Sequence, residues 1–398
     1  MTRSVRVGLC VDFREERWPS MDRVADSLLA QLERRHAVAI QARPVVPPFT
    51  RRASRVSSSR AAANVDRGWN RLWDYPRHVQ RLDADYDVFH VVDHSYAQLV
   101  HRLPASRTVV TCHDLDTFRS ILEPDRERRL APFKAMTRHI LAGLRRAALV
   151  TCDTAAVRDE LVQRGLLSPD RVVVAPIGVD PMFSSDADPE ADGEVARLTA
   201  APPEAIVLLH VGSTVARKRI DTLLRLTAEV RRTIPAVHLV RVGGSFTAEQ
   251  ERLLRELGLV EHVSVLPALA DRLLAAIYRR AALALLPSDR EGFGLPLVEA
   301  MASGTPVMAS DLPVLREVGE SAPVYCTHGD LDAWVSAALA LLSEREVAPE
   351  HWTARRSRGI ARARCFTWAG FADRMAGIYV DLARPRSIGS RESAACPA

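Results

Sequence analysis

Short apolar segments alternate with helical segments twice along this chain, and this pattern limits the fold more than any other feature. Strand and helix in alternation predict a parallel, doubly wound sheet. The sequence therefore predicts an α/β protein with two Rossmann-like domains. Strands of the first series are expected at Val5–Val11, Ala37–Ala42, Val88–Val92, Thr108–Cys112, Ala148–Cys152 and Val172–Ala175. Those of the second are expected at Ile206–Val211, His238–Val242, Val263–Leu266, Ala282–Leu286 and Pro306–Ala309.

The helices expected in the first half are Asp22–Arg34, Trp69–Leu82, Arg126–Arg146 and Thr154–Arg164. A chain of 398 residues is long enough for two domains of ordinary size. The segment 184–204 is acidic, small and proline-rich, which is typical of a linker. We therefore expect domains at 1–183 and 205–365, an amphipathic helix with aromatic anchors at 366–383, and a disordered tail at 384–398.

The composition fits a soluble globular protein, with 47% apolar and 26% charged residues. No apolar run is long enough to span a membrane, and the first residues form a short strand pattern rather than a signal peptide. The six cysteines are scattered without a C-x-x-C pair, which favours a reducing cytoplasm and argues against a zinc site. Basic residues do not cluster with interleaved aromatics, so nucleic-acid binding is not expected.

Lysine is rare, and one of the two lysines lies in a distinctive place. The net charge is +5, yet 52 of the 54 basic residues are arginine and only Lys134 and Lys218 are lysine. Lys218 and the preceding Arg217 follow a predicted strand and a loop opened by Gly212, just before a helix. A strand, a glycine loop, two cations and a helix N-terminus suit a diphosphate ligand. The alternative is an ordinary solvated basic run.

The most specific motif is the run PSDREGFGLPLVEAMASGTP, from Pro287 to Pro306. Glu291 lies on a glycine turn after a buried strand, and Glu299 lies in the first turns of the following helix. A carboxylate can accept hydrogen bonds from two neighbouring hydroxyl groups, so two carboxylates here suit a sugar-bearing ligand. Together with a helix N-terminus for phosphate, the run predicts a nucleotide-sugar site. The alternative is a pair of solvated surface glutamates.

This run resembles the donor-site signature of the retaining glycosyltransferases of family 4 (group 1), which have the two-domain GT-B fold. The resemblance implies two Rossmann-like domains facing each other across a cleft, with the final helix packing back on the first domain. It implies that Glu291 contacts the donor sugar, that Glu299 holds the ribose, and that Arg217 and Lys218 neutralise the leaving diphosphate. The turn residues implied to border the donor are Gly212, Gly292, Phe293, Gly294 and Leu295.

Two pairs of residues in the first half are candidates for the acceptor side and the reaction centre. His113 and Asp114 follow the strand Thr108–Cys112, and the run TCHD resembles the T-x-H-D pattern of the family. The resemblance implies that His113 borders the reaction centre, whereas Asp114 either orients His113 or meets the acceptor. The alternative is a buried structural histidine. The pair Asp93 and His94 follows another strand and is a weaker candidate for the acceptor side.

The turn after the first strand departs from the family pattern. Relatives carry a glycine-rich turn there, but REERWPSMDRVADSLL contains no glycine. Either the phosphate contact is made differently, or Trp18 and its neighbours shape an unusual acceptor pocket. The neighbouring Glu15 and Glu16 are not distinguishable from surface charges by sequence.

We expect a hexosyltransferase that moves a mannose- or glucose-type group from a nucleotide-diphosphate sugar to a glycan, small-molecule or lipid-linked acceptor. Retention of anomeric configuration is implied by the resemblance. Three D-x-D pairs are explained by chance, and cations already supply the charge that a metal would bring, so we expect no cofactor and no metal. A glycan phosphorylase, a sucrose-type synthase and a catalytically silent partner subunit are the alternatives. We expect a cytoplasmic protein, and a weak peripheral contact with the inner face of the membrane stays open because the first half carries basic segments such as Arg51–Arg60.

Overall fold

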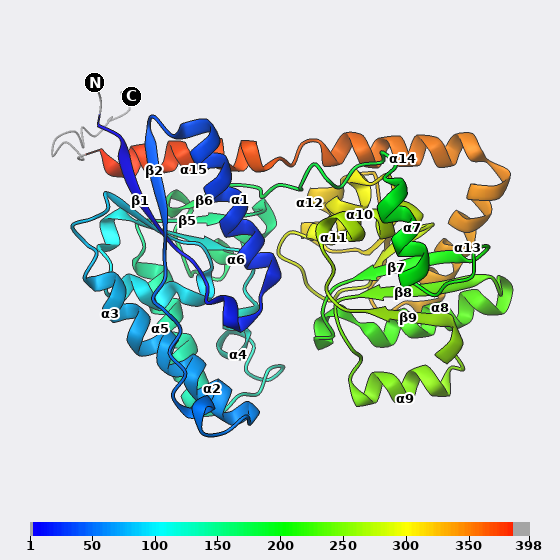
Figure 1. Cartoon of the computed structure of the whole chain (residues 1–398), viewed down its shortest axis with the longest axis horizontal. Helices are drawn as coiled ribbons and strands as arrows, with labels where there is room; N and C mark the ends of the chain where they lie inside the picture. Colours follow the sequence, from blue (N-terminus) through cyan, green and yellow to red (C-terminus); the bar gives the residue numbers. More distant parts are fainter. Residues whose placement is uncertain (1–2, 385–398) are drawn as a thin grey trace, which may run out of the picture.

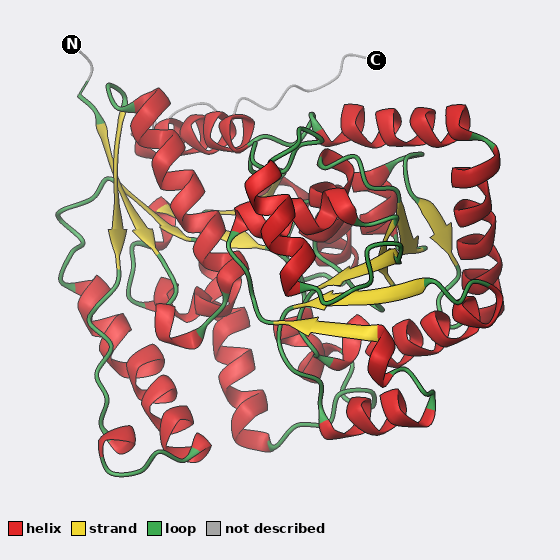
Figure 2. Cartoon of the chain, turned by 45° about the vertical axis from the view of Figure 1, so that its right-hand side comes forward, coloured by secondary structure: helices red, strands yellow, loops and turns green. Residues whose placement is uncertain are grey.

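The computed structural model describes residues 3–384 and contains two parallel sheets, each flanked by helices (Figures 1 and 2). The expected disordered tail, apart from Arg384, lies outside the described residues. The expectation of an α/β fold with two Rossmann-like sheets is confirmed. No helix among residues 3–384 is long and apolar enough to cross a membrane.

The sheet of the N-terminal domain has six parallel strands in the order β2-β1-β3-β4-β5-β6. The central strands are continuous apolar runs because helices cover both faces of a parallel sheet. Strand β2 begins at Ile40 instead of Ala37, because the preceding helix continues to His36. The strands are β1 (Val5–Cys10), β2 (Ile40–Val45), β3 (Val88–Val91), β4 (Thr108–Cys112), β5 (Leu149–Cys152) and β6 (Val172–Val174).

The sheet of the C-terminal domain also has six parallel strands, in the order β12-β11-β10-β7-β8-β9. Its edge strand β12 was not expected from the sequence, because three residues are too few to give a recognisable alternation. The strands are β7 (Ile206–Val211), β8 (Val237–Val242), β9 (Val263–Leu266), β10 (Leu283–Leu286), β11 (Val307–Ser310) and β12 (Val324–Cys326).

The helices of the N-terminal domain differ from the expected ones mainly in one region. The expected helix Trp69–Leu82 is the end of a longer unit in which a π-helical turn, Asn70–Asp74, separates two α-helices. Helix α5 starts later than expected, because Pro132 occupies its first turn. The helices are α1 (Pro19–His36), α2 (Arg60–Trp69), α3 (Tyr75–Gln80), α4 (Arg119–Leu122), α5 (Ala131–Arg146) and α6 (Ala155–Gln163).

The segment expected as a linker, 184–204, contains a helix, α7 (Pro189–Leu198). Asp188 accepts a hydrogen bond from the backbone N–H of Ala191, and Pro189 begins the first turn, so the helix start has a capping residue and a favoured first residue. Arg272 and Arg279 of helix α10 (Asp271–Arg280) form ion pairs with Asp188 and Asp192. The segment is therefore packed on the C-terminal domain.

Helix α15 runs back from the C-terminal domain along the top of the N-terminal domain (Figure 1). Its Asp373 pairs with Arg35 of α1, and its Tyr379 hydroxyl lies 2.7 Å from Nδ1 of His90 in β3. The helices of the C-terminal domain and of this return are α8 (Ile220–Thr233), α9 (Ala248–Glu256), α10 (Asp271–Arg280), α11 (Leu295–Ala302), α12 (Pro313–Gly319), α13 (Leu331–Val347), α14 (Pro349–Ala363) and α15 (Trp368–Ala383).

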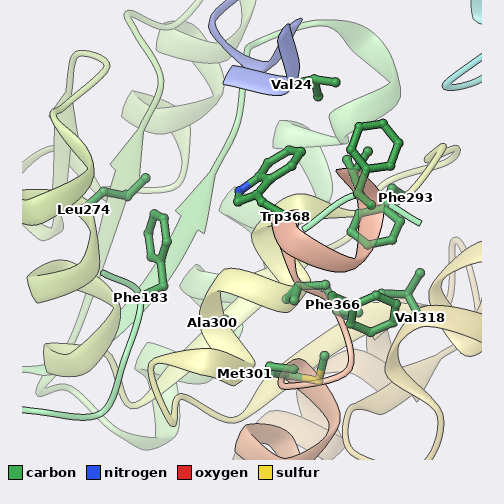
Figure 3. Close-up of a cluster of buried hydrophobic side chains, with 14 of the residues drawn as sticks. Val24, Phe183, Leu274, Phe293, Ala300, Met301, Val318, Phe366 and Trp368 are labelled. Carbon is green, nitrogen blue, oxygen red and sulfur yellow. The ribbon is translucent and has the colours of Figure 1, made fainter. Parts of the chain in front are cut away.

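The largest buried apolar cluster belongs to both domains. It contains Val24 of α1, Phe293 of the loop before α11 and Trp368 of α15, all of which lie close together in Figure 3. The two crossings of the chain between the domains also meet, because Val179 pairs with Thr367 in a β-bridge. This shared core fixes which strand ends face each other across the cleft.

Candidate active site

In each sheet the strand order reverses at one point, and the candidate residues follow the strands that flank this point. In the N-terminal sheet the chain places β2 on one side of β1 and β3 on the other. In the C-terminal sheet β8 and β10 flank β7 in the same way. Ligands of open α/β sheets bind outside the carboxyl ends of the strands at such points. The loops after β7 and β10 therefore carry Arg217, Lys218 and Glu291 to one place.

Lys218 and Arg217 both donate to the carboxylate of Glu291. Nζ of Lys218 lies 2.5 Å from Oε1, and Nη1 of Arg217 lies 3.3 Å from Oε2. The hydroxyl of Ser288 donates to Oε1 at 2.7 Å. Burial of Glu291 favours the neutral carboxyl, but Lys218 and Arg217 outweigh burial and lower its pKa to about 2. The three residues expected from two separate motifs thus form one partly buried charged group.

The loops beneath this group are braced by a buried arginine of β8 that sequence reasoning missed. Nη2 of Arg241 donates to the carbonyl oxygen of Gly212 at 2.8 Å, and Nη1 donates to that of Gly244. Burial lowers the pKa of Arg241 to about 10. An arginine within the apolar run of β8 is the signal that could have identified it, because a buried charge requires partners.

Glu299 is buried in the middle of α11, and both of its carboxylate oxygens already accept hydrogen bonds. Oε1 accepts a 2.7 Å hydrogen bond from Arg23 of α1, and Oε2 accepts one of 3.0 Å from the hydroxyl of Tyr278. Arg23 also donates to Asp271. Burial raises the pKa of Glu299, although Arg23 opposes this shift. The expected ribose ligand is therefore held by an arginine of the other domain.

The glycine turn after Glu291 presses against the N-terminal domain. A Cβ at Gly292 would lie 1.9 Å from the carbonyl oxygen of His113, so only glycine allows the two loops to meet. Gly294 has a φ of 90° at the start of α11, a conformation that favours glycine. The side chain of Phe293 packs on Phe366 in the buried core (Figure 3), which leaves its backbone for any ligand. Leu295, the first residue of α11, packs against the same core.

His113 is buried and both ring nitrogens have partners. Nδ1 lies 2.7 Å from Oδ2 of Asp153, and Nε2 lies 3.0 Å from the carbonyl oxygen of Val92. Burial opposes protonation, but Asp153 and the other partners outweigh it and raise the pKa of His113 to about 10. The orienting carboxylate is Asp153, after β5, and the expectation that Asp114 orients His113 is wrong. A polar residue directly after a buried strand is the signal that could have identified Asp153.

The remaining N-terminal candidates line the same sheet edge. Asp93 begins the 3-10 turn after β3 and accepts a hydrogen bond from the backbone N–H of Ser95. The buried ring of His94 has its nitrogens 3.3 Å from Asp93 and 3.7 Å from Asp114, without a hydrogen bond. Asp114 accepts a hydrogen bond from the backbone N–H of Asp116. The structure thus brings Asp93 and His94 beside the other expected pair, His113 and Asp114.

Ion pairs across the cleft hold the two domains together. Asp116 of the N-terminal domain forms ion pairs with Arg217 and with Arg290, each at 2.9 Å. Glu317 of α12 accepts from the backbone N–H groups of Ala155 and Ala156 at the start of α6. The cavity that these contacts leave between the domains, lined in part by Asp114, Arg290 and Glu291, has a volume of about 30 Å³. A donor molecule would have to replace some of these contacts.

The arrangement can hold and stabilise a dianionic leaving group. Arg217 and Lys218 are the cations nearest to Glu291, and preorganised charge at the position where negative charge develops is a large term in catalysis. The carboxylates of Glu291 and Glu299 can accept hydrogen bonds from hydroxyl groups. Among residues 3–384, no group of three or more His, Cys, Asp and Glu side chains is arranged to bind a metal ion.

Two facing Rossmann-like domains with this site between them define the GT-B class of glycosyltransferase fold. The chain matches the description "Glycosyltransferase Family 4" over residues 21–183 and "Glycosyl transferases group 1" over residues 196–356. The chain belongs to the family 4 (group 1) glycosyltransferases, and the predicted resemblance is confirmed.

Curated relatives include a D-inositol 3-phosphate glycosyltransferase of Stackebrandtia nassauensis, which is 34% identical over 62% of this chain and 57% of the relative. An MMP alpha-(1->4)-mannosyltransferase of Mycolicibacterium hassiacum is 31% identical over 58% of this chain and 53% of the relative. The chain thus spans little more than half the length of these two relatives in the alignments.

Solved structures share the fold over nearly the whole chain. Sucrose-phosphate synthase of Thermosynechococcus elongatus superposes with a TM-score of 0.74 at 20% identity, covering 96% of this chain and 99% of the other. HepE of Anabaena, solved with UDP and glucose, superposes with a TM-score of 0.69 at 18% identity, covering 95% and 100%. At these identities the likeness concerns the fold.

Proposed function

We propose that this protein is a hexosyltransferase that takes a mannose- or glucose-type group from a nucleotide-diphosphate sugar. The observation that carries the proposal is the partly buried contact of Lys218 and Arg217 with Glu291, at the point where the strand order of the C-terminal sheet reverses. Two cations beside a carboxylate offer both a diphosphate contact and a sugar-hydroxyl contact.

In this proposal the diphosphate takes the place of Glu291 as a partner of Lys218 and Arg217. Glu291 then accepts hydrogen bonds from the donor sugar, and Glu299 accepts them from the ribose. The cations disperse the charge that grows on the diphosphate as the glycosidic bond breaks. The relative named as a mannosyltransferase and the fold neighbours solved with UDP or UDP-glucose support a donor of this class.

Retention of anomeric configuration and turnover without a metal are parts of the proposal. Retention follows the family, and Arg217 and Lys218 supply positive charge that a metal ion would otherwise bring. Proton NMR of the product shows whether the configuration is retained. Turnover in excess chelator should equal turnover in added magnesium, and loss of activity with chelator would contradict this part.

Two other classes use a site of the same design. A phosphorylase or a sucrose-type synthase would run the transfer with phosphate or with a free nucleotide, and product analysis with those co-substrates distinguishes them. A silent partner subunit would lack donor turnover altogether. The intact group of Lys218, Arg217 and Glu291 favours an active transferase.

The test is binding of a panel of nucleotide sugars to the purified full chain. A ligand at ~100 times its dissociation constant stabilises the folded protein by ~2.7 kcal/mol, which a thermal-shift assay detects. We expect one nucleotide series, such as the UDP sugars or GDP-mannose, to raise the unfolding temperature. Lys134→Ala should respond in the same way, because Lys134 lies on α5 in the other domain. A panel without any shift would contradict the proposal.

We propose a peripheral membrane contact only for the case in which the acceptor is lipid-linked. The exposed surface of the N-terminal domain carries Trp69, Leu72 and Trp73, and the guanidinium of Arg77 lies over the Trp73 ring. Tryptophan and arginine together suit the interface of an anionic bilayer. Sedimentation with anionic liposomes at low and raised salt tests this contact. Protein missing from the low-salt pellet would exclude it.

A further inference from the structure

A buried polar cluster lies next to the candidate reaction centre, in the glycine-free turn after β1. Asp12 follows β1, Asp93 follows β3, and Glu16 lies in the 3-10 turn between β1 and α1. All three carboxyl groups are buried. With Arg71, Ser95 and Gln98 they form what we call the acidic cluster. The sequence could not separate Glu15 from Glu16, but the structure does, because Glu15 is exposed and Glu16 is buried.

The acidic cluster lies where open α/β sheets bind their ligands. Strands β1 and β3 flank the point where the strand order of the N-terminal sheet reverses. Asp12 and Asp93 lie at the carboxyl ends of these two strands. The next strand, β4, is followed directly by His113, whose ring lies 6.5 Å from that of His94. Since His113 contacts the donor-side turn at Gly292, the cluster is beside the reaction centre on the acceptor side.

Several buried atoms of the cluster have no hydrogen-bond partner. They are the acceptors Oδ2 of Asp12, Oε1 of Glu16 and Oε1 of Gln98, together with one donor, Nε of Arg71. Asp12 and Glu16 are each more than nine-tenths buried, with relative exposures of 7% and 8%. A buried polar atom without a partner costs free energy, and a ligand that supplies the missing partner removes this cost. Unpartnered acceptors outnumber the unpartnered donor three to one, so the missing ligand groups are mainly donors.

The cation of the cluster is engaged through both of its Nη atoms, whereas its Nε has no partner. Arg71 lies in the π-helical turn Asn70–Asp74, a rare element that often marks functional sites. Its guanidinium donates to Oε2 of Glu16 at 3.4 Å and to the hydroxyl of Ser95 at 2.6 Å. It also lies 4.0 Å from the centre of the Tyr96 ring. A phosphate group would have to displace these contacts and then face three carboxyl groups.

The charge balance of the cluster favours an incoming cation. Even without Asp12, the carboxyl groups of Glu16 and Asp93 outnumber Arg71, and the neighbouring His113 is already paired with Asp153. Burial, followed by the nearby Asp93, raises the pKa of Asp12 well above its usual range, against the effect of Arg71. The carboxylates are not grouped to hold a metal ion among the described residues. The missing cation is therefore an organic one.

We propose that the acidic cluster binds an ammonium group of the acceptor, so that the acceptor is an amine-bearing polyol of the amino sugar or aminocyclitol class. This inference rests on the proposed glycosyltransferase function. Asp12 and Glu16 accept hydrogen bonds from the ammonium group, and Gln98 accepts one from a neighbouring hydroxyl. A neutral polyol would supply the donors but not the charge, and a phosphorylated polyol would bring the wrong charge.

The test compares acceptors that share a ring and differ in one group. A hexose series consists of glucosamine, glucose and glucose 6-phosphate, and a cyclitol series consists of an inosamine, myo-inositol and inositol 1-phosphate. Each compound is added to the full chain saturated with the nucleotide sugar that the donor panel identifies. Calorimetry gives the affinity, and release of nucleoside diphosphate gives the transfer rate. The amine should bind about tenfold or more tightly than its neutral counterpart in at least one series.

Two variants assign the preference to the cluster. Glu16→Gln and Asp12→Asn keep the shape and remove the charge, so each should reduce the preference for the amine to about threefold or less. Glu15→Gln is the matched control, because it removes the neighbouring exposed charge, and it should keep the full preference. Affinity for the nucleotide sugar should stay unchanged in all three variants.

The outcomes separate this inference from the function on which it rests. Failure of the wild type to bind any nucleotide sugar contradicts the proposed function itself. Normal donor binding combined with equal or tighter binding of the neutral or phosphorylated member in both series overturns only the inference. So does failure of every compound in both series to bind, or a preference that persists in both Glu16→Gln and Asp12→Asn.

Discussion

Arg23 of α1 donates a 2.7 Å hydrogen bond to Glu299 of α11, so a residue of the first domain occupies the carboxylate proposed to hold the donor ribose. The same guanidinium contacts Asp271 of α10. Because Arg23 and Glu299 lie in different domains, their contact couples closure of the cleft to the binding of nucleotide at the donor site. A nucleotide that binds Glu299 has to compete with Arg23.

Arg23→Gln should therefore bind the free nucleoside diphosphate more tightly, by about fivefold to tenfold, because a competing partly buried ion pair of about 1 kcal/mol is removed. Calorimetry measures the change. Arg35→Gln is the control, because Arg35 lies on the same helix and pairs with the exposed Asp373. Weaker binding by Arg23→Gln would mean that Arg23 is a donor ligand rather than a competitor.

The two glutamates should respond differently to neutralisation. Glu299→Gln should weaken both the nucleoside diphosphate and the intact nucleotide sugar, because both contain the ribose. Glu291→Gln should weaken the nucleotide sugar by about tenfold, the scale of a lost hydrogen bond to a charged group. It should leave binding of the nucleoside diphosphate unchanged or tighter, because Lys218 loses its carboxylate partner. Calorimetry that shows the reverse pattern would assign Glu291 to the ribose and Glu299 to the donor sugar.

Gly292→Ala should separate the two domains locally. The added Cβ would lie 1.9 Å from the carbonyl oxygen of His113, which is too close for any real contact. We expect the unfolding temperature to fall by about 5 °C and turnover to fall more steeply, because the loops that carry Glu291 and His113 move apart. Gly193→Ala in α7 is the control, because its Cβ would meet nothing within 4 Å. Equal behaviour of the two variants would contradict this interpretation.

The pair of His113 and Asp153 predicts a specific dependence of stability on pH. Asp153 and the other polar partners raise the pKa of His113 to about 10 despite burial, so His113 binds its proton more tightly in the folded protein. This contribution is complete below about pH 6.5, the unfolded pKa of histidine, and is lost as the pH rises towards the folded pKa.

Asp153→Asn should reduce stability by about 3 kcal/mol at pH 6.5, because it breaks a buried ion pair. The difference between wild type and variant in unfolding temperature should shrink as the pH rises towards 10. A difference that stays constant, or that grows with pH, would show that His113 is neutral in the folded protein.

Much of the fold could be predicted because the strands of both sheets are continuous apolar runs separated by recognisable helices. The strands β4, β7 and β9 were predicted with their observed bounds. The errors lie where local signals are weak or were overridden. The edge strand β12 is too short to show alternation, and the composition of 184–204 hid a capped helix.

The candidate site could be predicted only on its motif-bearing side. Lys218 and Glu291 belong to two motifs with a definite spacing, and the structure brings them together. Asp153 carried a usable signal as a polar residue directly after a buried strand, but Arg23 and Arg71 could not be predicted, because their significance depends on which distant residue each one meets. An arginine on an amphipathic helix looks like any surface charge until the other domain is placed against it.

The most direct test of the account is turnover of the nucleotide sugar by the wild type and by Lys218→Ala. The variant should lose a factor of ~100 or more in the release of nucleoside diphosphate, the scale of one lost charge-stabilising donor. Lys134→Ala, which replaces the only other lysine of the sequence, should keep normal turnover. Unfolding temperatures of both variants show that they are folded. Near-normal turnover by a folded Lys218→Ala variant would contradict the central claim that this lysine stabilises the leaving diphosphate.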